Sequence, residues 1–410
     1  MILDIINKKR LGEELTYQEI DTIFNGYLNG EVADYQMSAM LMAICINGMS
    51  DDEVFALTKI FIESGDVLDF SDIPGVKVDK HSTGGIGDKT TLVIAPIVAA
   101  CGGVMIKMSG RGLGYTGGTI DKLESIEGFK IDLTEKEIKK QVKDIHLVVT
   151  GQTKDLVPMD KVIYALRDVT STVSSVPLIA SSIMSKKIAG GADKILIDIK
   201  VGNGALLQDK KDAKKLEELM VKIGKYYNRE VRCVISDMNN PLGTSIGNSL
   251  EVIEAMDVLR GVETSNSFYD LCIELSTILV SMIYQIDEKE AKVMVLNSIQ
   301  TGSAYQKFEE MVRLQKGDLS KIKVSNKTYE IKSNKSGVVK SINALEVGKL
   351  SLALGAGKEK IGDKIDYTVG VKLEKLVGDS VKRGDTLATI YYKNKKVDVE
   401  VDSLFEIFSK

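Results

Sequence analysis

The fold is decided by the stretch KHSTGGIGDKTT at residues 80–91. The short segment Val76–Asp79 comes before it and is expected to be a β-strand, and the apolar segment Leu92–Ala100 comes after it and is expected to be a helix. Glycines after a strand let the backbone turn tightly and direct its N–H groups toward a ligand. The following helix offers its N-terminal N–H groups and dipole to an anion. The stretch therefore predicts an anion site in an α/β fold.

A second loop, KMSGRG at residues 107–112, repeats this theme. It follows an expected strand at Val104–Met108 and leads to an expected helix at Thr119–Ile126. The first loop supplies a charge from Lys80 and hydroxyl groups from Ser82 and Thr91. Two basic, hydroxyl-rich loops on successive strands predict a two-sided cradle for an anion.

The rest of the chain is typical of an α/β protein with added domains. Further strands are expected at Leu147–Thr150, Ile195–Lys200 and Val231–Ser236. The fold class is α/β: a helical domain, a large α/β domain with a central mixed sheet, and a C-terminal α+β lobe. The predicted boundaries are 1–66 for the helical domain, completed by about 158–191; 67–157 and 192–330 for the α/β phosphate-binding domain; and 331–410 for the C-terminal domain.

Composition narrows the class of protein further. The chain has 410 residues and a net charge of -4, which argues against binding along a nucleic acid, because such proteins usually carry a positive field. Four cysteines stand at positions 45, 101, 233 and 272 without a C-x-x-C pair, so a reducing compartment is expected. We find no signal-peptide pattern and no apolar run long enough to span a membrane. A cytoplasmic protein without a membrane partner is the expectation.

Two familiar nucleotide motifs do not explain the loops. A Walker A loop needs Gly-Lys-Ser/Thr, but Asp88 separates Gly87 from Lys89. The segment GLGYTG at 112–117 matches G-x-G-x-x-G, with Asp132 about twenty residues on. However, 36 glycines make chance matches common, and the first glycine already lies in a basic loop. A dinucleotide site is therefore disfavoured.

Three signatures resemble those of the thymidine and pyrimidine-nucleoside phosphorylases. They are KHSTGG at 80–85, SGRGLG at 109–114 and TGGTIDKLE at 116–124. The likeness extends over essentially the whole chain. The resemblance implies a homodimer that acts on phosphate and a pyrimidine nucleoside.

The resemblance also assigns roles to residues. Those expected to bind phosphate are Lys80, His81, Ser82, Thr91, Lys107, Met108, Ser109 and Thr119. Those expected to bind the nucleoside are Tyr164, Arg167, Ser182 and Lys186. Ser182 and Lys186 stand four residues apart, so they share one face of a helix. The expected catalytic residues are His81, Arg167 and Lys186.

The implied reaction is reversible phosphorolysis, in which phosphate attacks the sugar C1′ with inversion and the free base leaves. Arg167 and Lys186 would stabilise negative charge on the departing base. His81 would donate a hydrogen bond or a proton to the base carbonyl. Lys107 resembles the lysine of the broader enzymes, where thymidine-specific ones carry an apolar residue. The expected substrates are therefore uridine, thymidine and deoxyuridine.

The broader enzymes bind a potassium ion, which bears on whether a cofactor is needed. The corresponding positions here are Gly87, Lys89, Leu242, Ser245 and Glu254. Lys89 stands where those enzymes tend to have threonine, so its ammonium is expected to replace the ion and pair with Glu254. The alternative is that Lys89 faces solvent and a metal still binds. No cofactor is expected to be required.

Two rival functions are left open by the sequence. A phosphoribosyltransferase resembling the anthranilate enzyme shares glycine-rich loops and would use Asp88 and Glu124 to hold magnesium. A non-catalytic nucleotide-sensing module would not need Arg167, Ser182 and Lys186 together with His81. The KHS signature at 80–82 favours the phosphorylase.

Overall fold

The described chain forms two compact units in the computed structural model, which describes residues 1–112, 114–153, 155–360, 362–394 and 397–408. Leu113, within the predicted SGRGLG signature, lies outside the described residues. Unit 1 comprises Met1–His81, Thr153–Ile197 and Asp209–Cys233, and unit 2 comprises Ser82–Gln152, Asp198–Gln208 and Val234–Lys410. Three strands pass from unit 1 into unit 2: β1 (Lys77–Ser82), β4 (Lys194–Val201) and β5 (Glu230–Asp237).

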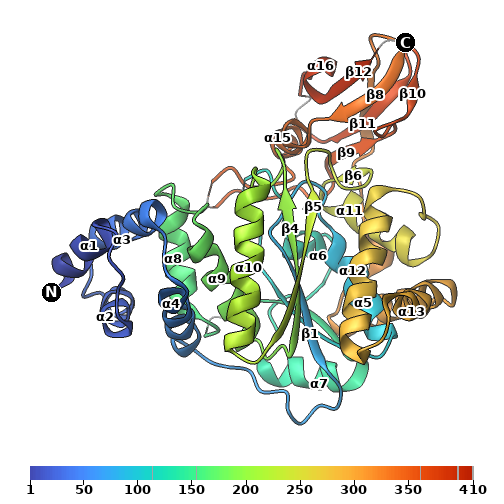
Figure 1. The fold of residues 1–410 in the computed structure, drawn as a ribbon. Helices are drawn as coiled ribbons and strands as arrows, with labels where there is room; N and C mark the ends of the chain where they lie inside the picture. Colours follow the sequence, from blue (N-terminus) through green and yellow to red (C-terminus); the bar gives the residue numbers. More distant parts are fainter. Residues whose placement is uncertain (113, 154, 361, 395–396, 409–410) are drawn as a thin grey trace. The chain divides into compact units, whose positions relative to one another are not determined.

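Unit 1 is dominated by helices (Figure 1). They are α1 (Ile2–Arg10), α2 (Tyr17–Leu28), α3 (Asp34–Asn47), α4 (Asp51–Glu63), α8 (Pro158–Asp168), α9 (Val176–Ala189) and α10 (Lys210–Tyr226). The hydroxyl groups of Thr16 and Ser50 cap α2 and α4, each completing a capping box. Helix α4 packs on α9, and α9 packs on α10, so segments far apart in sequence share one helical layer.

The central sheet has the strand order β3-β2-β1-β4-β5, with β2 at Val104–Ser109 and β3 at Leu147–Gly151. It is parallel, where a mixed sheet was expected, and Met105 pairs with Leu147 in the β2–β3 register. All but the last residues of β2 and β3 are buried, as in sheets covered on both faces. The α/β class is confirmed.

Unit 2 holds the helices of the α/β part that follow the first glycine loop. They are α5 (Thr90–Ala100), α6 (Thr119–Glu124), α7 (Glu135–Ile145), α11 (Asn248–Leu259), α12 (Ser267–Tyr284), α13 (Glu288–Gln300) and α14 (Ser303–Leu314), followed by the 3₁₀ turn Leu319–Lys321. Helix α5 is buried from Thr90 to Ala99 and packs against α11, α12, α13 and α14. Its buried first turn follows the first glycine loop.

Helix α12 departs from one sequence expectation. By length and composition it is apolar enough to cross a membrane, whereas no such run was expected. Two-thirds of that window, 67%, is buried against the rest of the protein, including α5 and α13. Its apolar surface is therefore used in the core of unit 2.

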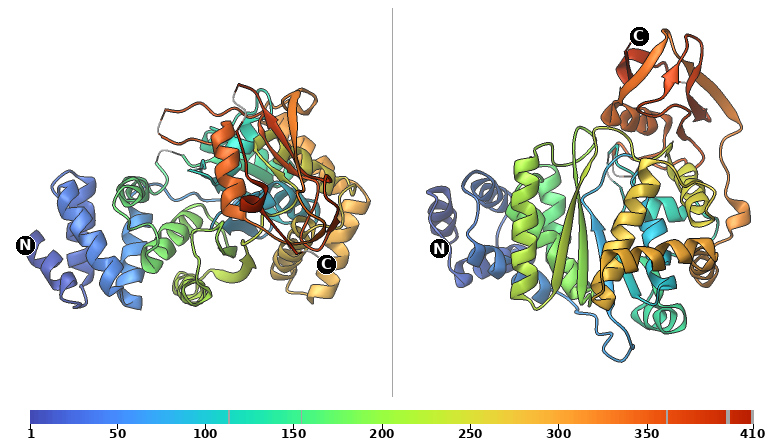
Figure 2. Two further views of the ribbon diagram at one scale, coloured as in Figure 1. Left: turned by 90° about the horizontal axis from the view of Figure 1, so that it is seen from above. Right: turned by 45° about the vertical axis from the view of Figure 1, so that its right-hand side comes forward.

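The C-terminal part of unit 2 is a lobe of short antiparallel strands with one longer helix (Figure 2). One sheet has the order β6 (Ser245–Ile246), β9 (Gly370–Leu373), β11 (Thr386–Tyr392) and β7 (Lys327–Lys332). The other has the order β10 (Ser380–Val381), β8 (Gly337–Ile342) and β12 (Phe405–Phe408), beside α15 (Ala344–Leu354) and α16 (Val401–Leu404). Strand β6 comes from the segment before α11, so this lobe anchors the backbone at Ser245.

Candidate active site

The first glycine loop begins later than expected. Lys80, His81 and Ser82 are the last residues of β1 rather than part of the loop, and the Lys80 side chain is buried. Gly87 has a φ of 73°, and a Cβ placed there would lie 2.6 Å from the carbonyl oxygen of Leu242. Only glycine fits there, because a side chain would be strained and would collide with backbone.

Asp88 organises the hydroxyl groups of this loop. Its carboxylate accepts a short hydrogen bond from the Ser82 hydroxyl and one of 2.6 Å from the Thr90 hydroxyl. Thr91 follows in the buried first turn of α5. Ser82 and Thr91, both expected to bind phosphate, therefore lie at the two ends of one ordered loop.

A buried ion pair stands behind the loop on β4, and the sequence did not reveal it. The Lys200 ammonium donates to Asp198 at 2.7 Å and to the Ser236 hydroxyl at 3.1 Å. Burial opposes the charge of Lys200, but Asp198 and Asp88 outweigh it, and its pKa is raised. The Lys200 backbone N–H donates to the Thr83 hydroxyl, which ties this pair to the loop.

The second loop follows a buried hydroxyl group, that of Ser109. The Ser109 hydroxyl, at the end of β2, is buried and makes no hydrogen bond with any part of the chain that the structure describes. Next to it, the buried Lys107 ammonium donates to the Met108 carbonyl at 3.2 Å. Burying a hydroxyl without a hydrogen-bond partner is costly, so Ser109 points to a ligand that offers an acceptor.

Asp121 holds the second loop closed. Its carboxylate accepts from the backbone N–H of Gly112 at 2.6 Å and of Gly118 at 3.3 Å. A Cβ at Gly112 would lie 2.4 Å from the Gly118 nitrogen, so both strands of the loop need glycine to approach this closely. This closure fixes Thr119, the first residue of α6.

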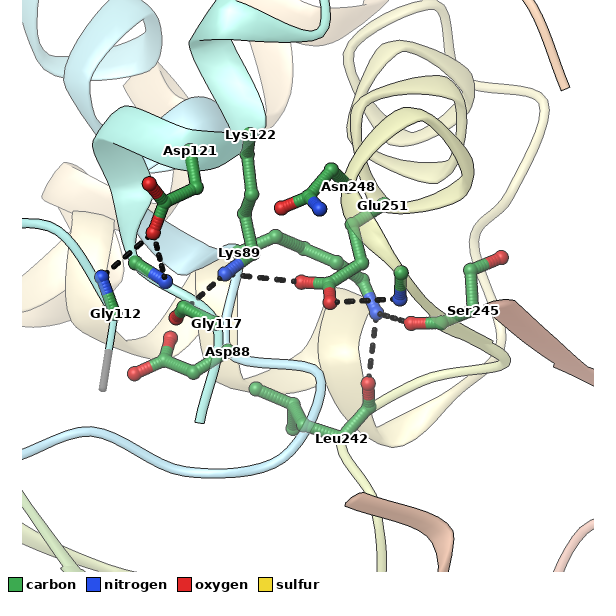
Figure 3. Close-up of polar contacts among 12 residues, drawn as sticks. Asp88, Lys89, Gly112, Gly117, Asp121, Lys122, Leu242, Ser245, Asn248 and Glu251 are labelled. Atoms are coloured by element: carbon green, nitrogen blue, oxygen red, sulfur yellow. Dashed lines mark hydrogen bonds and ion pairs between the residues drawn. The ribbon is translucent and has the colours of Figure 1, made fainter. Parts of the chain in front are cut away.

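The positions expected to hold potassium are occupied by an ammonium group (Figure 3). Lys89 Nζ lies 2.8 Å from the Leu242 carbonyl, 3.0 Å from the Ser245 carbonyl and 2.6 Å from Glu254 Oε2. The Lys89 side chain is 0% exposed, so it does not face solvent.

Glu254 is the anionic partner of this ammonium. Its two oxygens also accept from the backbone N–H groups of Thr244 and Ser245, each at 2.8 Å. Burial raises the pKa of Glu254, but Lys89 and these two N–H groups outweigh it and hold that pKa below its usual value. The residues that would bind potassium therefore already form a complete ion pair.

A second buried lysine lies beside the first. Lys122 Nζ is 3.3 Å from Glu251 and donates to the Gly117 carbonyl at 2.9 Å. Glu251 and Glu254 are one turn apart on α11, and Figure 3 shows Lys122 reaching from α6 toward α11 near Lys89. The two pairs tie both glycine loops to the same helix.

The residues expected to bind the nucleoside all lie in unit 1. Lys186 Nζ, on α9, donates to Asp160 Oδ2 at 2.6 Å and to the Ser182 hydroxyl at 3.1 Å. The Tyr164 ring lies 6.0 Å from the Lys186 ammonium and 5.6 Å from the Arg167 guanidinium. The structure therefore brings these four residues together around Asp160, which the sequence did not reveal.

Arg167 is a buried cation of α8. Its guanidinium donates to the carbonyls of Thr172 and Val173, in the chain that links α8 to α9, and to the carbonyl of Leu178 in the first turn of α9. Burial lowers the pKa of Arg167, and the charge of Asp160 partly offsets this. Three of its five N–H groups thus tie α8 to the start of α9.

The expected residues fall into two groups by unit. Ser82, Thr91, Lys107, Met108, Ser109 and Thr119 belong to unit 2, and Tyr164, Arg167, Ser182 and Lys186 belong to unit 1 together with Lys80 and His81. The group in unit 2 supplies hydroxyl and ammonium donors, which suit an anion. The group in unit 1 includes the cations Arg167 and Lys186 beside the Tyr164 ring.

Comparison with known proteins matches three parts of the chain to family models. Residues 3–65 match the helical bundle domain of a glycosyl transferase family, residues 75–305 match the a/b domain of that family, and residues 338–407 match the pyrimidine nucleoside phosphorylase C-terminal domain. The chain is 48% identical to a pyrimidine-nucleoside phosphorylase of Staphylococcus haemolyticus over 99% of this chain and 95% of that one. It is 47% identical to one of Geobacillus stearothermophilus, with the same coverage.

A solved structure shares the fold at low identity. The anthranilate phosphoribosyltransferase of Thermus thermophilus superposes with a TM-score of 0.61 at 16% identity, over 76% of this chain and 99% of that one. This likeness shows the fold alone. The full-length matches and the C-terminal domain decide the family: the chain belongs to the pyrimidine-nucleoside phosphorylases.

Proposed function

We propose that this chain catalyses the reversible phosphorolysis of pyrimidine nucleosides. A phosphate oxygen forms a bond to the sugar C1′ while the C1′–N1 bond breaks, and the electron pair leaves with the base, which takes up a proton. The products are the free base and a sugar 1-phosphate. The observation that carries the proposal is the buried Ser109 hydroxyl in a two-loop anion cradle, which has no hydrogen-bond partner among the described residues. The relatives of this chain are pyrimidine-nucleoside phosphorylases, which supports the same reaction.

Phosphate is assigned to the two loops. Lys80 and Lys107 supply positive charge, Ser82, Thr91, Ser109 and Thr119 supply hydroxyl groups, and Met108 supplies backbone. Asp88 holds the Ser82 hydroxyl, which transfers its hydrogen bond to the phosphate when that anion binds. A cradle fixed in this way positions the nucleophile without reorganisation during the reaction.

The base is assigned to the cluster on α8 and α9. Lys186 and the remaining N–H groups of Arg167 stabilise the negative charge that develops on the pyrimidine oxygens. Ser182 adds a hydroxyl, Tyr164 adds a ring face, and His81 donates a hydrogen bond or a proton to the base carbonyl. The reaction requires that both groups of residues act on one nucleoside and one phosphate.

Substrate breadth follows from Lys107. Its buried ammonium adds a donor for phosphate or for sugar hydroxyls, so ribonucleosides are expected as well as deoxyribonucleosides. Purified protein should release uracil from uridine and from deoxyuridine, and thymine from thymidine, in each case only when phosphate is present. Activity on thymidine alone would contradict the assigned breadth.

We infer that the Lys89 ammonium replaces potassium. The carbonyls of Leu242 and Ser245 and the carboxylate of Glu254 all contact it, so the residues present do not fit a metal ion. The reaction rate should therefore be the same in potassium chloride and in tetramethylammonium chloride of equal ionic strength. Strong activation by potassium would refute the inference.

The rival phosphoribosyltransferase function would need the carboxylates of Asp88 and Glu124 to hold magnesium, but both already have partners in the protein. Glu124 forms an ion pair with Arg111 and accepts from the Tyr367 hydroxyl at 3.1 Å. Asp88 accepts from the Ser82 and Thr90 hydroxyls. Both carboxylates thus serve the loops themselves. A requirement for magnesium and a diphosphate sugar would favour the rival.

A cytoplasmic homodimer in pyrimidine salvage is the proposed setting. All four cysteines, each among the described residues, are free, which suits a reducing compartment.

An exposed apolar face on α3 supports the dimer. It carries Tyr35, Met42 and Ile46, which share one face by helical spacing, and Leu3 on the neighbouring α1 is exposed as well. A sedimentation mass of twice the 44.8 kDa chain is expected, and a monomer mass would contradict the dimer.

A further inference from the structure

Asp160 is a buried carboxylate, and only one of its two oxygens has a hydrogen-bond partner among the described residues. It is the third residue of α8, and its side chain is 4% exposed. Oδ2 accepts from the Lys186 ammonium at 2.6 Å. Oδ1 is buried and has no hydrogen-bond partner within the ranges that the structure describes. Burying such an oxygen without a donor is unfavourable, so Asp160 points to a ligand that brings one.

The neighbours of Asp160 identify the site to which it belongs. Asp160, Tyr164 and Arg167 stand at i, i+4 and i+7, which places them on one face of α8. Lys186 and Ser182 join them from α9. Asp160 therefore lies within the cluster assigned to the base.

The cluster around Asp160 has a net positive charge, and two of its side chains are exposed enough to let a ligand in. Two cations and one carboxylate leave one net positive charge to meet the departing base. The residues beside Asp160 are partly exposed, at 24% for the Lys186 side chain and 40% for Tyr164. A ligand can therefore reach the carboxylate by displacing these two side chains, whereas Arg167 is held by its three backbone carbonyls.

The polar pattern of the cluster matches one class of base. Uracil and thymine present O2, N3–H and O4 along one edge, in the order acceptor, donor, acceptor. Arg167 and Lys186 are donors, and Asp160 is an acceptor. Resting on the function proposed above, we propose that Asp160 Oδ1 accepts the N3–H of the base, so that Asp160 is the specificity-determining residue for pyrimidine-2,4-diones.

This assignment predicts which bases are rejected. Cytosine carries a lone pair at N3, which would face the carboxylate, and an N3-methyl base has no donor to offer. In both cases Oδ1 stays buried without a hydrogen bond. A site built around such a group rejects analogues that lack the donor far more strongly than an apolar pocket does.

The first test uses the unaltered protein and does not need catalysis. Binding of uracil and of 3-methyluracil is measured by calorimetry in the presence of phosphate. Uracil should bind at least about tenfold more tightly, as expected for loss of a hydrogen bond to a charged group. Equal binding would overturn the proposal even if uridine is phosphorolysed. Selective binding without phosphorolysis would instead sustain it and refute the proposed function.

The second test separates recognition of the base from support of Lys186. Asp160→Asn keeps the shape of the side chain and an oxygen for Lys186, but its amide can donate to a cytosine N3. We expect kcat/KM for uridine to fall about 10–100-fold. We also expect kcat/KM for uridine divided by kcat/KM for cytidine to fall at least about tenfold. A fall in uridine activity with an unchanged ratio would overturn the proposal. Asp168→Asn, on the exposed side of the same helix, is the matched control and should change neither quantity.

Discussion

Substituting Ser109 by alanine should raise KM for phosphate by about 10–100-fold, while the free energy of unfolding stays unchanged or rises slightly. The Ser109 hydroxyl is buried and has no partner among the described residues, so the folded protein loses no hydrogen bond when it is removed. The bound phosphate, by contrast, loses a charge-assisted hydrogen bond, which is stronger than one between neutral groups. A change in phosphate affinity without a change in stability is the signature of a ligand-binding hydroxyl.

The matched control for this variant is Ser276→Ala. Ser276 is also a buried hydroxyl without a partner in the described part of the chain, but it lies in the core helix α12. Like Ser109→Ala, Ser276→Ala should leave the free energy of unfolding unchanged, but it should not affect KM for phosphate. An unaltered phosphate KM for Ser109→Ala would remove the second loop from the phosphate site.

Substituting Glu254 by alanine should lower the free energy of unfolding by about 3–5 kcal/mol. The Lys89 ammonium would then stay buried at 0% exposure without an anionic partner, in contact with the carbonyls of Leu242 and Ser245 and the face of the Phe268 ring. Urea unfolding followed by circular dichroism measures the change. The double variant Lys89→Met with Glu254→Leu should recover most of the loss, because it removes both charges and fills the space with apolar groups.

An exposed ion pair provides the comparison. Lys140 and Asp144 on α7 lie 3.8 Å apart, with side chains 79% and 47% exposed. Asp144→Asn should therefore cost less than about 1 kcal/mol. If Glu254→Ala cost no more than Asp144→Asn, the buried cation account would be wrong.

The same pair predicts the response to acid. The pKa of Glu254 is lower in the folded protein than its ordinary value of 4.5. Its contribution to stability is therefore complete above about pH 4.5 and is lost as the pH falls through the lower folded pKa. The unaltered protein should lose stability more steeply in this range than the double variant does.

Much of the architecture was predictable because local signals and burial agree. Helix α8 begins at Pro158 because proline suits a first helical turn, and the capping boxes at Thr16 and Ser50 mark the starts of α2 and α4. The buried strands were found from their apolar runs. Strand β1, however, continues to Ser82, whereas the sequence predicted its end at Asp79. The prediction stopped early because the polar residues Lys80 and His81 resemble a loop in sequence.

The site was predictable only where a motif or a resemblance carried it. Asp160 was missed because a carboxylate in a first helical turn usually lies on the surface, and only the fold reveals that it is buried against Lys186. The pair of Asp198 and Lys200 was missed because alternate charged residues on a strand suggest a solvated face. Its only signal was the placement of both charges in an otherwise apolar, buried strand.

The most direct measurement of the central claim is ³¹P nuclear magnetic resonance of the purified protein with uridine and phosphate. The account predicts that the phosphate signal declines while that of an α-configured ribose 1-phosphate grows, in step with free uracil and without added magnesium. Release of uracil without consumption of phosphate, or no release at all, would contradict it.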